Sequence, residues 1–258
     1  MKCYTIFNKN VYKNFYWPIR SFLLKLGRSG RCGKTGMSEL DTLNARAHAA
    51  LIAALRRGEL RAGQFLSMPQ LVEMLGLPLA AVREAVRHAG ASGLLDIIPK
   101  RGVQILEATP ETIRDSLDLR MVLDQEGARR RILDQEALKS LPALRESHVE
   151  MLEAAQGAAT AQLSLRAIQV DLSLHDFMAA GLDNPLLRAA YDANRVRISI
   201  IQQVRPFVQE RILSAMQEHL AIIDALQDGD VSAAVAGIAY HNERTQHWWG
   251  VTAYSRSA

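Results

Sequence analysis

Cysteine is almost absent from this 258-residue sequence, and its two cysteines, Cys3 and Cys32, both lie within the first 36 residues. A disulfide framework is therefore excluded for the rest of the chain, which can fold in a reducing compartment. Long apolar runs are also missing, because none approaches the roughly 20 residues that a membrane-spanning helix needs. We therefore expect a cytoplasmic protein with no membrane partner.

Acidic residues are missing from residues 1–36, which carry eight Lys or Arg. The whole chain has a net charge of +4, but this charge is unevenly distributed. Residues 41–106 hold eight basic and five acidic residues, whereas residues 107–258 carry a net charge of −6. A basic module joined to an acidic one is typical of a DNA reader attached to a domain that avoids DNA.

The basic extension, residues 1–36, differs in composition from the remainder of the chain, being rich in Lys, Asn, Tyr and Phe rather than Ala, Leu and Arg. One interpretation is an amphipathic arm over Phe15–Leu26 that binds nucleic acid or a membrane. The other is a disordered or upstream-translated stretch, with the start of the protein at Met37. We favour the second interpretation and leave the extension out of the fold prediction.

Residues 37–107 carry the pattern of a winged helix-turn-helix. Apolar residues at helical spacing predict a first helix of about four turns that ends at Gly58. A short helix over 68–75 and a second helix over 78–92 follow, joined by a tight turn. Two short apolar runs within 94–106 flank a basic tip and indicate a β-hairpin.

From residue 108 to residue 250 we find only helical periodicity, beginning with a capping threonine and a proline at Thr109-Pro110. Helices of about 20 residues with short connections form antiparallel bundles. The fold is therefore predicted to be mostly α, a winged helix-turn-helix followed by an all-α antiparallel six-helix bundle and a tail over 251–258. The six predicted helices are 110–133, 136–156, 162–181, 185–204, 207–227 and 230–249.

The N-terminal module, over residues 45–106, resembles the GntR family of bacterial regulators. The most specific part of the resemblance is a Val-Arg-Glu-Ala sequence followed by a Gly-Leu stop. The resemblance implies a transcription regulator, more often a repressor, that binds a double-stranded DNA operator. The segments that carry it are Gly58 with Gly63, Leu71–Gly76, Val82–Arg87, Ser92–Leu95 and Arg101–Val103.

The recognition helix of this module is expected to present arginines to the major groove. Arg83 and Arg87 are four residues apart and therefore share one helix face, and arginine can bridge guanine O6 and N7. Lys100 and Arg101 at the hairpin tip can reach phosphates or the minor groove, and Gly102 permits close approach. The alternative is that these charges form a solvated face.

The start of the recognition helix departs from the family pattern, because Pro78-Leu79-Ala80-Ala81 replaces the usual Ser-Arg pair and proline. Loss of the capping serine costs about 1 kcal/mol. Loss of a base-reading arginine removes roughly 1–3 kcal/mol of discrimination. We therefore expect an unusual operator or weaker binding, with Leu79 in contact with a thymine methyl group.

The helical half contains a candidate metal site. Asp171 and His175 are four residues apart on one helix and share a face, while His219 and His241 come from two later helices. One carboxylate and three imidazoles from three helices can converge in a bundle core. This ligand set suits zinc, nickel, iron or manganese. The alternative is a hydrogen-bonded polar core without metal.

The helical half also resembles the ligand-sensing FadR C-terminal domain, abbreviated FCD, and its six helices favour the VanR-type branch. The resemblance implies that Asp171, His175, His219 and His241 bind a divalent metal ion that meets the carboxylate of a small organic acid. The matching segments are Leu119-Arg120 with Leu123-Asp124, Asp171 with His175, Asn184–Leu187, Glu218-His219 with Ile222, and Gly229-Asp230 leading to His241.

Three arginines are candidates for holding the effector carboxylate, since a planar guanidinium suits that group. Arg120 is the first choice, and Arg195 and Arg197 are further candidates. The alternative role of Arg120 is an exposed partner for Asp124, four residues on.

We therefore predict a homodimeric regulator whose two recognition helices read a palindrome and whose DNA affinity depends on a small organic acid. Two alternatives remain open. A metal-dependent enzyme acting on a small carboxylate would also leave a coordination position free. The missing cap and Leu79 fit an effector-binding module that has lost its DNA specificity.

Overall fold

The computed structural model describes residues 39–157, 160–205 and 207–251, within a compact unit that begins at Glu39. The predicted basic extension and all but the first residue of the predicted tail lie outside the described residues. No described helix combines the length and the apolar character needed to cross a membrane.

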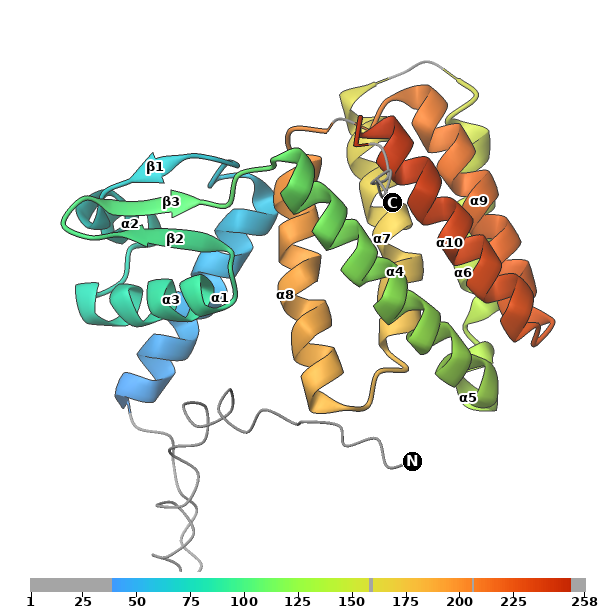
Figure 1. Ribbon diagram of the computed structural model, residues 1–258, viewed down its shortest axis with the longest axis horizontal. Coiled ribbons are helices and arrows are strands. Elements are labelled where there is room, and N and C mark those ends of the chain that lie inside the picture. Colours follow the sequence, from blue (N-terminus) through green and yellow to red (C-terminus); the bar gives the residue numbers. More distant parts are fainter. Residues whose placement is uncertain (1–38, 158–159, 206, 252–258) are drawn as a thin grey trace, which may run out of the picture. The chain divides into compact units, whose positions relative to one another are not determined.

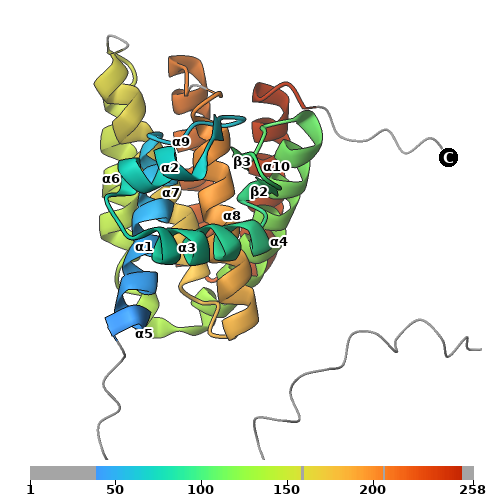
Figure 2. The ribbon, with the colours of Figure 1, turned by 90° about the vertical axis from the view of Figure 1, so that its left-hand side faces the viewer.

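The N-terminal part contains helices and a small sheet in the order expected for a winged helix-turn-helix (Figures 1 and 2). The sheet has three antiparallel strands in the order β1-β3-β2, so the predicted hairpin gains an edge strand. That strand was missed because two residues are too few to show alternation. The elements are α1 (Glu39–Arg57), β1 (Phe65–Leu66), α2 (Met68–Leu75), α3 (Leu79–Ala91), β2 (Leu95–Ile98) and β3 (Gly102–Ile105).

Local sequence fixes both ends of the short helix α2. The Gln70 side chain accepts a hydrogen bond from the Ser67 backbone N–H at 2.9 Å, which satisfies one of the free donors at the helix start. Gly76 ends the helix in the left-handed conformation, at φ 62°. Helix α3 begins after Pro78 without any side-chain cap, as the departure from the family pattern predicted.

A glycine at position 102 is required by the fold itself, independently of its predicted contact with DNA. A Cβ atom at this position would overlap the carbonyl oxygen of Leu66 on β1, and the backbone has φ 147°. The close approach that the glycine permits is therefore the approach of one strand to another. Contact between Gly102 and DNA stays a prediction.

The C-terminal part is entirely helical over the described residues, with six long helices and one of four residues. The predicted fold class is confirmed. The helices are α4 (Pro110–Leu133), α5 (Gln135–Leu138), α6 (Leu141–Ala154), α7 (Ala161–Ala179), α8 (Pro185–Gln202), α9 (Gln209–Gln227) and α10 (Val231–Trp248).

The single helix predicted over 136–156 is wrong, because the structure divides it into α5 and α6. Pro142 lies in the first turn of α6. Proline has no N–H to donate and its ring clashes with the carbonyl four residues earlier, so within a helix it kinks or breaks the helix. The apolar periodicity continues across this break and concealed it.

Helix α4 packs against four other bundle helices, α7, α8, α9 and α10 (Figure 1). Where α4 meets α7, a Cβ atom on Gly127 would overlap the carbonyl oxygen of Met178. The two helix backbones therefore approach more closely than any larger residue allows. Leu174, Met178 and Ile223 are fully buried in the core next to this crossing.

Candidate metal centre and adjoining pocket

Four side chains from three helices converge in the bundle core. Asp171 and His175 come from α7, His219 from α9 and His241 from α10. Each offers one ligand atom, these atoms all lie within 4.8 Å of one another, and all four residues are buried. The structure thus brings together the four residues that sequence reasoning selected.

The spacing of the ligand atoms suits a small cation. His219 Nε2 lies 3.4 Å from His241 Nε2 and 3.6 Å from Asp171 Oδ1, and His175 Nε2 lies 3.9 Å from Asp171 Oδ2. Ligands at about 2.1 Å from a tetrahedral zinc ion are roughly 3.4 Å apart. A slight contraction of the cluster would bring all four atoms to bonding distance.

Carboxylates fix the proton position on two of the histidines. His175 Nδ1–H donates to Asp124 Oδ2 at 2.7 Å, and His241 Nδ1–H donates to Glu218 Oε2 at 2.7 Å. In each ring the Nε2 lone pair is then free to bind a metal. Carboxylate partners of this kind orient metal-binding imidazoles and raise their basicity.

A fourth histidine, His148 on α6, fixes the position of the proton on His219. His148 Nδ1–H donates to the carbonyl oxygen of Leu144 at 2.8 Å, so its Nε2 is an acceptor. His219 Nδ1–H then donates to His148 Nε2 at 3.2 Å. Sequence reasoning missed His148 because it shares no ligand spacing with the other three.

The Nε2 lone pairs of the three imidazoles and the Asp171 carboxylate therefore point at one place, and no proton lies between them. His175 Nε2 is buried and has no hydrogen-bond partner. Burial, followed by the neighbouring histidines, lowers the pKa of both His219 and His241 well below the usual value, so both rings are neutral. A neutral imidazole is the form that binds metal, and the residues present fit a divalent cation.

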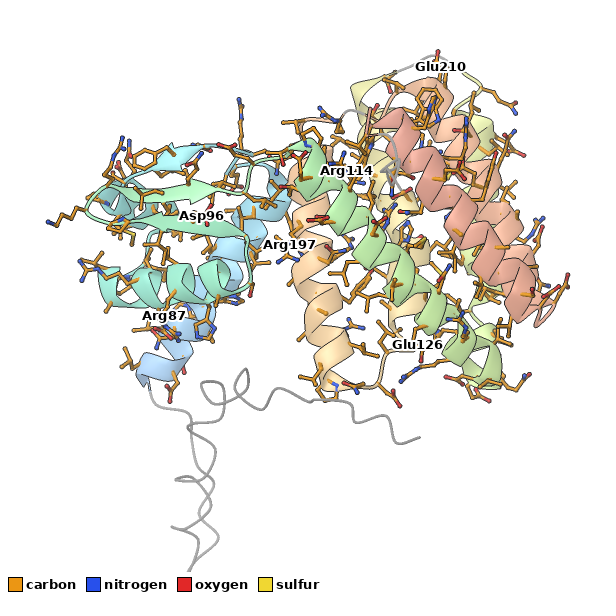
Figure 3. All side chains as sticks on the ribbon, viewed as in Figure 1. Arg87, Asp96, Arg114, Glu126, Arg197 and Glu210 are labelled. Atoms are coloured by element: carbon orange, nitrogen blue, oxygen red, sulfur yellow. The ribbon has the colours of Figure 1, made fainter. Side chains whose placement is uncertain are left out.

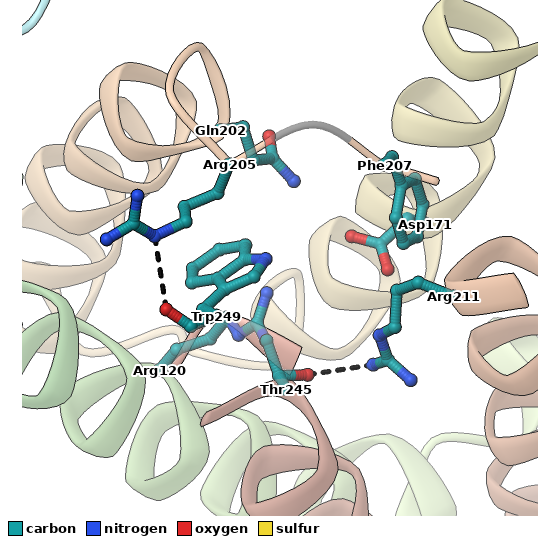
Figure 4. Close-up of a pocket in the computed structure, with 8 residues that line it drawn as sticks. All are labelled: Arg120, Asp171, Gln202, Arg205, Phe207, Arg211, Thr245 and Trp249. Atoms are coloured by element: carbon teal, nitrogen blue, oxygen red, sulfur yellow. Dashed lines mark hydrogen bonds between the residues drawn. The ribbon is translucent and has the colours of Figure 1, made fainter. Parts of the chain in front are cut away.

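A pocket adjoins this cluster and contains Asp171 (Figure 4). Its free volume is about 10 Å³, close to the space of one water molecule. Arg120 lines it and is only 5% exposed, which excludes the alternative of an exposed partner for Asp124. The lining residues are Arg120, Asp171, Gln202, Arg205, Phe207, Arg211, Thr245 and Trp249.

Arg120 differs from the other buried arginine of the pocket in its hydrogen bonding. Arg120 Nη2 is buried without a partner. Arg211, in contrast, donates to both oxygens of Glu218 at 2.8 and 2.9 Å and to Thr245 at 2.8 Å. Burial raises the pKa of Glu218, and the Arg211 guanidinium offsets part of this rise. Arg120 is thus the buried cation with capacity for an anion.

The other two arginines predicted to contact the effector, Arg195 and Arg197, do not line this pocket. Arg195 pairs with Asp176 and donates to Ser199. Arg197 donates through Nη2 to the carbonyl oxygen of Ser92 at 2.5 Å. Their guanidinium groups already have protein acceptors, and contact with an effector stays a prediction for both residues.

On α3, Arg83 and Arg87 are both exposed (Figure 3 labels Arg87). Arg87 donates through Nε and Nη2 to Glu84, at 3.0 and 2.5 Å. The Arg87 hydrogen bond is the main cause that lowers the pKa of Glu84 to about 2. The two arginines therefore differ: Arg87 has an intramolecular carboxylate partner that any DNA contact must share or displace.

At the hairpin tip, Lys100 takes a left-handed conformation with φ 62°. The Arg101 guanidinium lies 5.7 Å from the centre of the Phe65 ring. Leu79 is 43% exposed at the start of α3. All three are accessible, as a DNA-contacting role requires.

A family model described as "FCD domain" matches residues 115–244, half of the chain. Among solved structures, one described as a putative transcriptional regulator GntR from Rhodococcus sp. RHA1 is similar with a TM-score of 0.63 and 18% identity, covering 83% of this chain and 100% of that one. The structure described as E. coli McbR/YncC is similar with a TM-score of 0.61 and 16% identity, covering 81% and 97%. At these identities the likeness establishes the fold. No protein with a curated description matches the sequence.

Proposed function

Because the chain belongs to the FCD domain family, we propose that it is a DNA-binding transcription regulator of the GntR type, controlled by a small organic acid. The observation that carries the proposal is a buried Asp-His-His-His cluster in the same compact unit as a winged helix-turn-helix. On this proposal the protein is a regulator, more often a repressor, rather than an enzyme. Six long helices support the VanR-type branch.

The DNA-reading role rests on α3 and the β2–β3 hairpin. Arg83, on the exposed face of α3, reads a guanine in the major groove, and Arg87 reads or supports a neighbouring base. Leu79 meets an apolar base edge, while Lys100 and Arg101 contact the sugar-phosphate backbone next to Gly102. A homodimer then reads two half-sites of a palindrome.

The metal-holding role belongs to Asp171, His175, His219 and His241. When bound, a divalent ion supplies a Lewis-acidic position for a carboxylate oxygen. The chain's own residues prepare this position: Asp124, Glu218 and His148 hold the three imidazoles with Nε2 directed inward. The absence of thiols leaves zinc, nickel, iron and manganese as candidates.

The effector is a small organic acid held by Arg120. Its buried, unpartnered Nη2 supports this role, because a buried guanidinium without an acceptor is costly and a carboxylate supplies one. The small free volume of the pocket means that one or more of the lining side chains must move to admit the acid.

The first test is metal analysis of the purified protein together with a thermal-shift screen of small organic acids, with and without chelator. We expect stoichiometric metal and stabilisation by at least one acid that the chelator abolishes. Arg120→Ala should remove the stabilisation by acid while keeping the metal. Absence of metal, with no acid that stabilises the protein, would show that the cluster is only a polar core.

The DNA-reading role has a separate test. Arg83→Ala should remove selectivity for the operator, a loss of roughly 1–3 kcal/mol at the position it reads. Lys100→Ala should weaken binding to all sequences similarly, since phosphate contacts carry no sequence information. Competition binding against scrambled DNA measures both effects. Unchanged selectivity in Arg83→Ala would refute the docking arrangement.

A further inference from the structure

The chain reverses its direction directly after α10. Trp249 caps this helix, and Gly250 follows in the left-handed conformation, at φ 70°. The Gly250 N–H donates to the carbonyl oxygen of His247 at 3.0 Å, and the Val251 N–H donates to that of Gln246 at 2.9 Å. These two hydrogen bonds form a Schellman motif, which ends a helix and turns the following residues back over it.

The α10 turn, defined as Trp249–Val251, covers one side of the pocket. The Trp249 side chain lines the pocket. Trp249 and Val251 are both buried, in one apolar cluster with Ile198 and Ile201 of α8. With the turn in this position the free volume of the pocket is about 10 Å³, which holds one water molecule but no carboxylic acid.

A side-chain hydrogen bond fastens the α10 turn to the segment that follows α8. Arg205 lines the pocket and donates through Nε to the carbonyl oxygen of Trp249 at 3.1 Å (Figure 4). Its Nη1 donates to the carbonyl oxygen of Val204 at 3.2 Å. Both acceptors are uncharged. Because a carboxylate is a stronger acceptor for a guanidinium than a carbonyl is, an arriving acid can take Arg205 away from Trp249.

Other parts of the lining are held more firmly than the α10 turn. Arg211 donates to both oxygens of Glu218 and to Thr245. Phe207 lies between α8 and α9, and its carbonyl oxygen accepts a hydrogen bond from Ser164 Oγ at 3.1 Å. Movement of these residues would break charge-assisted hydrogen bonds or displace a segment that is fixed at both ends. Within the described residues the α10 turn is joined to a helix on one side only.

We propose that the α10 turn is the gate of the pocket and that Arg205 is its latch. An acid reaches Arg120 when Arg205 leaves the Trp249 carbonyl and the turn moves away. The inference rests on the proposed function, because it concerns how the acid enters that pocket. The closed pocket cannot bind, so the apparent affinity for the acid is reduced to the extent that the gate is closed.

Gly250→Ala tests the gate without changing a side chain of the pocket. An added Cβ atom would meet no atom within 4 Å, so only the left-handed backbone is strained. This strain should raise the opening rate roughly 5–30-fold. One measurement is hydrogen exchange of the Val251 N–H without acid. The other is the limiting rate at which zinc-loaded protein binds acetate, followed by stopped-flow tryptophan fluorescence. Both rates should rise by the same factor.

Gly76→Ala is the matched control for the gate. Gly76 also ends a helix in the left-handed conformation, at φ 62°, and an added Cβ atom there would meet no atom within 4 Å. The same strain at the end of α2, in the winged helix-turn-helix, should leave acetate binding and exchange at Val251 unchanged.

Arg205→Ala tests the latch and should also speed acetate binding. Its control is Arg188→Ala. Arg188 Nη1 donates to the backbone carbonyl of Ala179 at 3.3 Å, and Arg188 is not among the residues that line the pocket. This variant should bind acetate at the wild-type rate.

The outcomes separate the gate from the sensing function. If acetate binds wild type and Gly250→Ala at the same rate, the gate is refuted and the sensing function stands. An unchanged rate in Arg205→Ala alone overturns the role of Arg205 as latch. If zinc-loaded wild type and Gly250→Ala both fail to bind acetate, both proposals fail.

Discussion

At the scale of single residues, the candidate metal centre depends on side chains that would not touch a bound metal ion. Each of the three imidazoles is held by a different group: a carboxylate from α4, a carboxylate from α9 and a neutral imidazole from α6. The direction of three lone pairs is therefore a property of residues from several helices. Changes to these partners should alter metal affinity without removing a ligand.

Asp124→Asn is predicted to lower metal affinity by roughly 10–100-fold, because the His175 imidazole loses the charge that raises its basicity. Chelator competition on the folded protein measures the change. Asp176→Asn is the matched control, since Asp176 is also hydrogen-bonded, to Tyr191 at 2.6 Å, but holds no ligand. Equal metal affinity in Asp124→Asn and wild type would contradict the role of Asp124.

Glu84→Gln is predicted to strengthen binding to non-specific DNA, because Arg87 is released from its carboxylate partner. The slope of log K against log salt should steepen by about one unit if the released guanidinium meets a phosphate. Glu73→Gln removes the same charge from an exposed position of α2 and should leave the slope nearly unchanged. An unaltered slope in Glu84→Gln would mean that Arg87 already contacts DNA fully.

At the scale of helices and strands, the close crossing of α4 and α7 sets the geometry of the centre. Gly127 permits the crossing, and it lies one turn beyond Asp124, which bonds His175 on α7. The distance between these two helices therefore decides whether the carboxylate reaches the imidazole.

Gly127→Ala is predicted to destabilise the protein by about 1–2 kcal/mol. Alanine gains roughly 0.5–1 kcal/mol over glycine within a helix, but overlap with a backbone carbonyl costs about 1–3 kcal/mol. Chemical denaturation, together with a loss of metal affinity, measures the effect. In Gly237→Ala the added Cβ atom meets only the movable Ile222 side chain, at 3.0 Å, so a smaller effect is expected. Equal stability of both variants would remove the steric explanation.

Helices whose ends are marked by capping residues in the local sequence were predicted well. Helix α4 has its predicted bounds because Thr109 caps it, accepting a hydrogen bond from the Thr112 backbone N–H. The four ligands were found from their resemblance and spacing. His148 and the hydrogen bonds of Arg211 to Glu218 and Thr245 were not predicted from the sequence. Only the packing of α6, α9 and α10 brings these residues to the centre, and the spacing of residues in the sequence does not reveal that packing.

At the scale of the whole molecule, the candidate metal centre joins α7 to α9 and α10, with the whole of α8 lying between α7 and α9 in the sequence. A bound metal ion should therefore stabilise the entire bundle against unfolding, since the ligands are together only in the folded state. The size of this stabilisation follows from mass action.

Removal of the metal is predicted to destabilise the folded protein by about 4 kcal/mol when the free metal concentration is about 1,000 times its Kd. For a domain of this size that corresponds to a fall in Tm of roughly 8–16 °C. Calorimetry with and without chelator measures the fall. His219→Ala should melt at the same temperature in both conditions, and a chelator effect in that variant would point to metal bound elsewhere.

The order of the ligands along the chain also governs how the protein is made. The ribosome delivers Asp171 and His175 first, then His219, and His241 last of the four. The residues of the winged helix-turn-helix are therefore synthesised well before the four ligands can come together. The four ligands come together only after His241 has been synthesised, so metal loading follows the folding of α7, α9 and α10 rather than guiding the earlier helices.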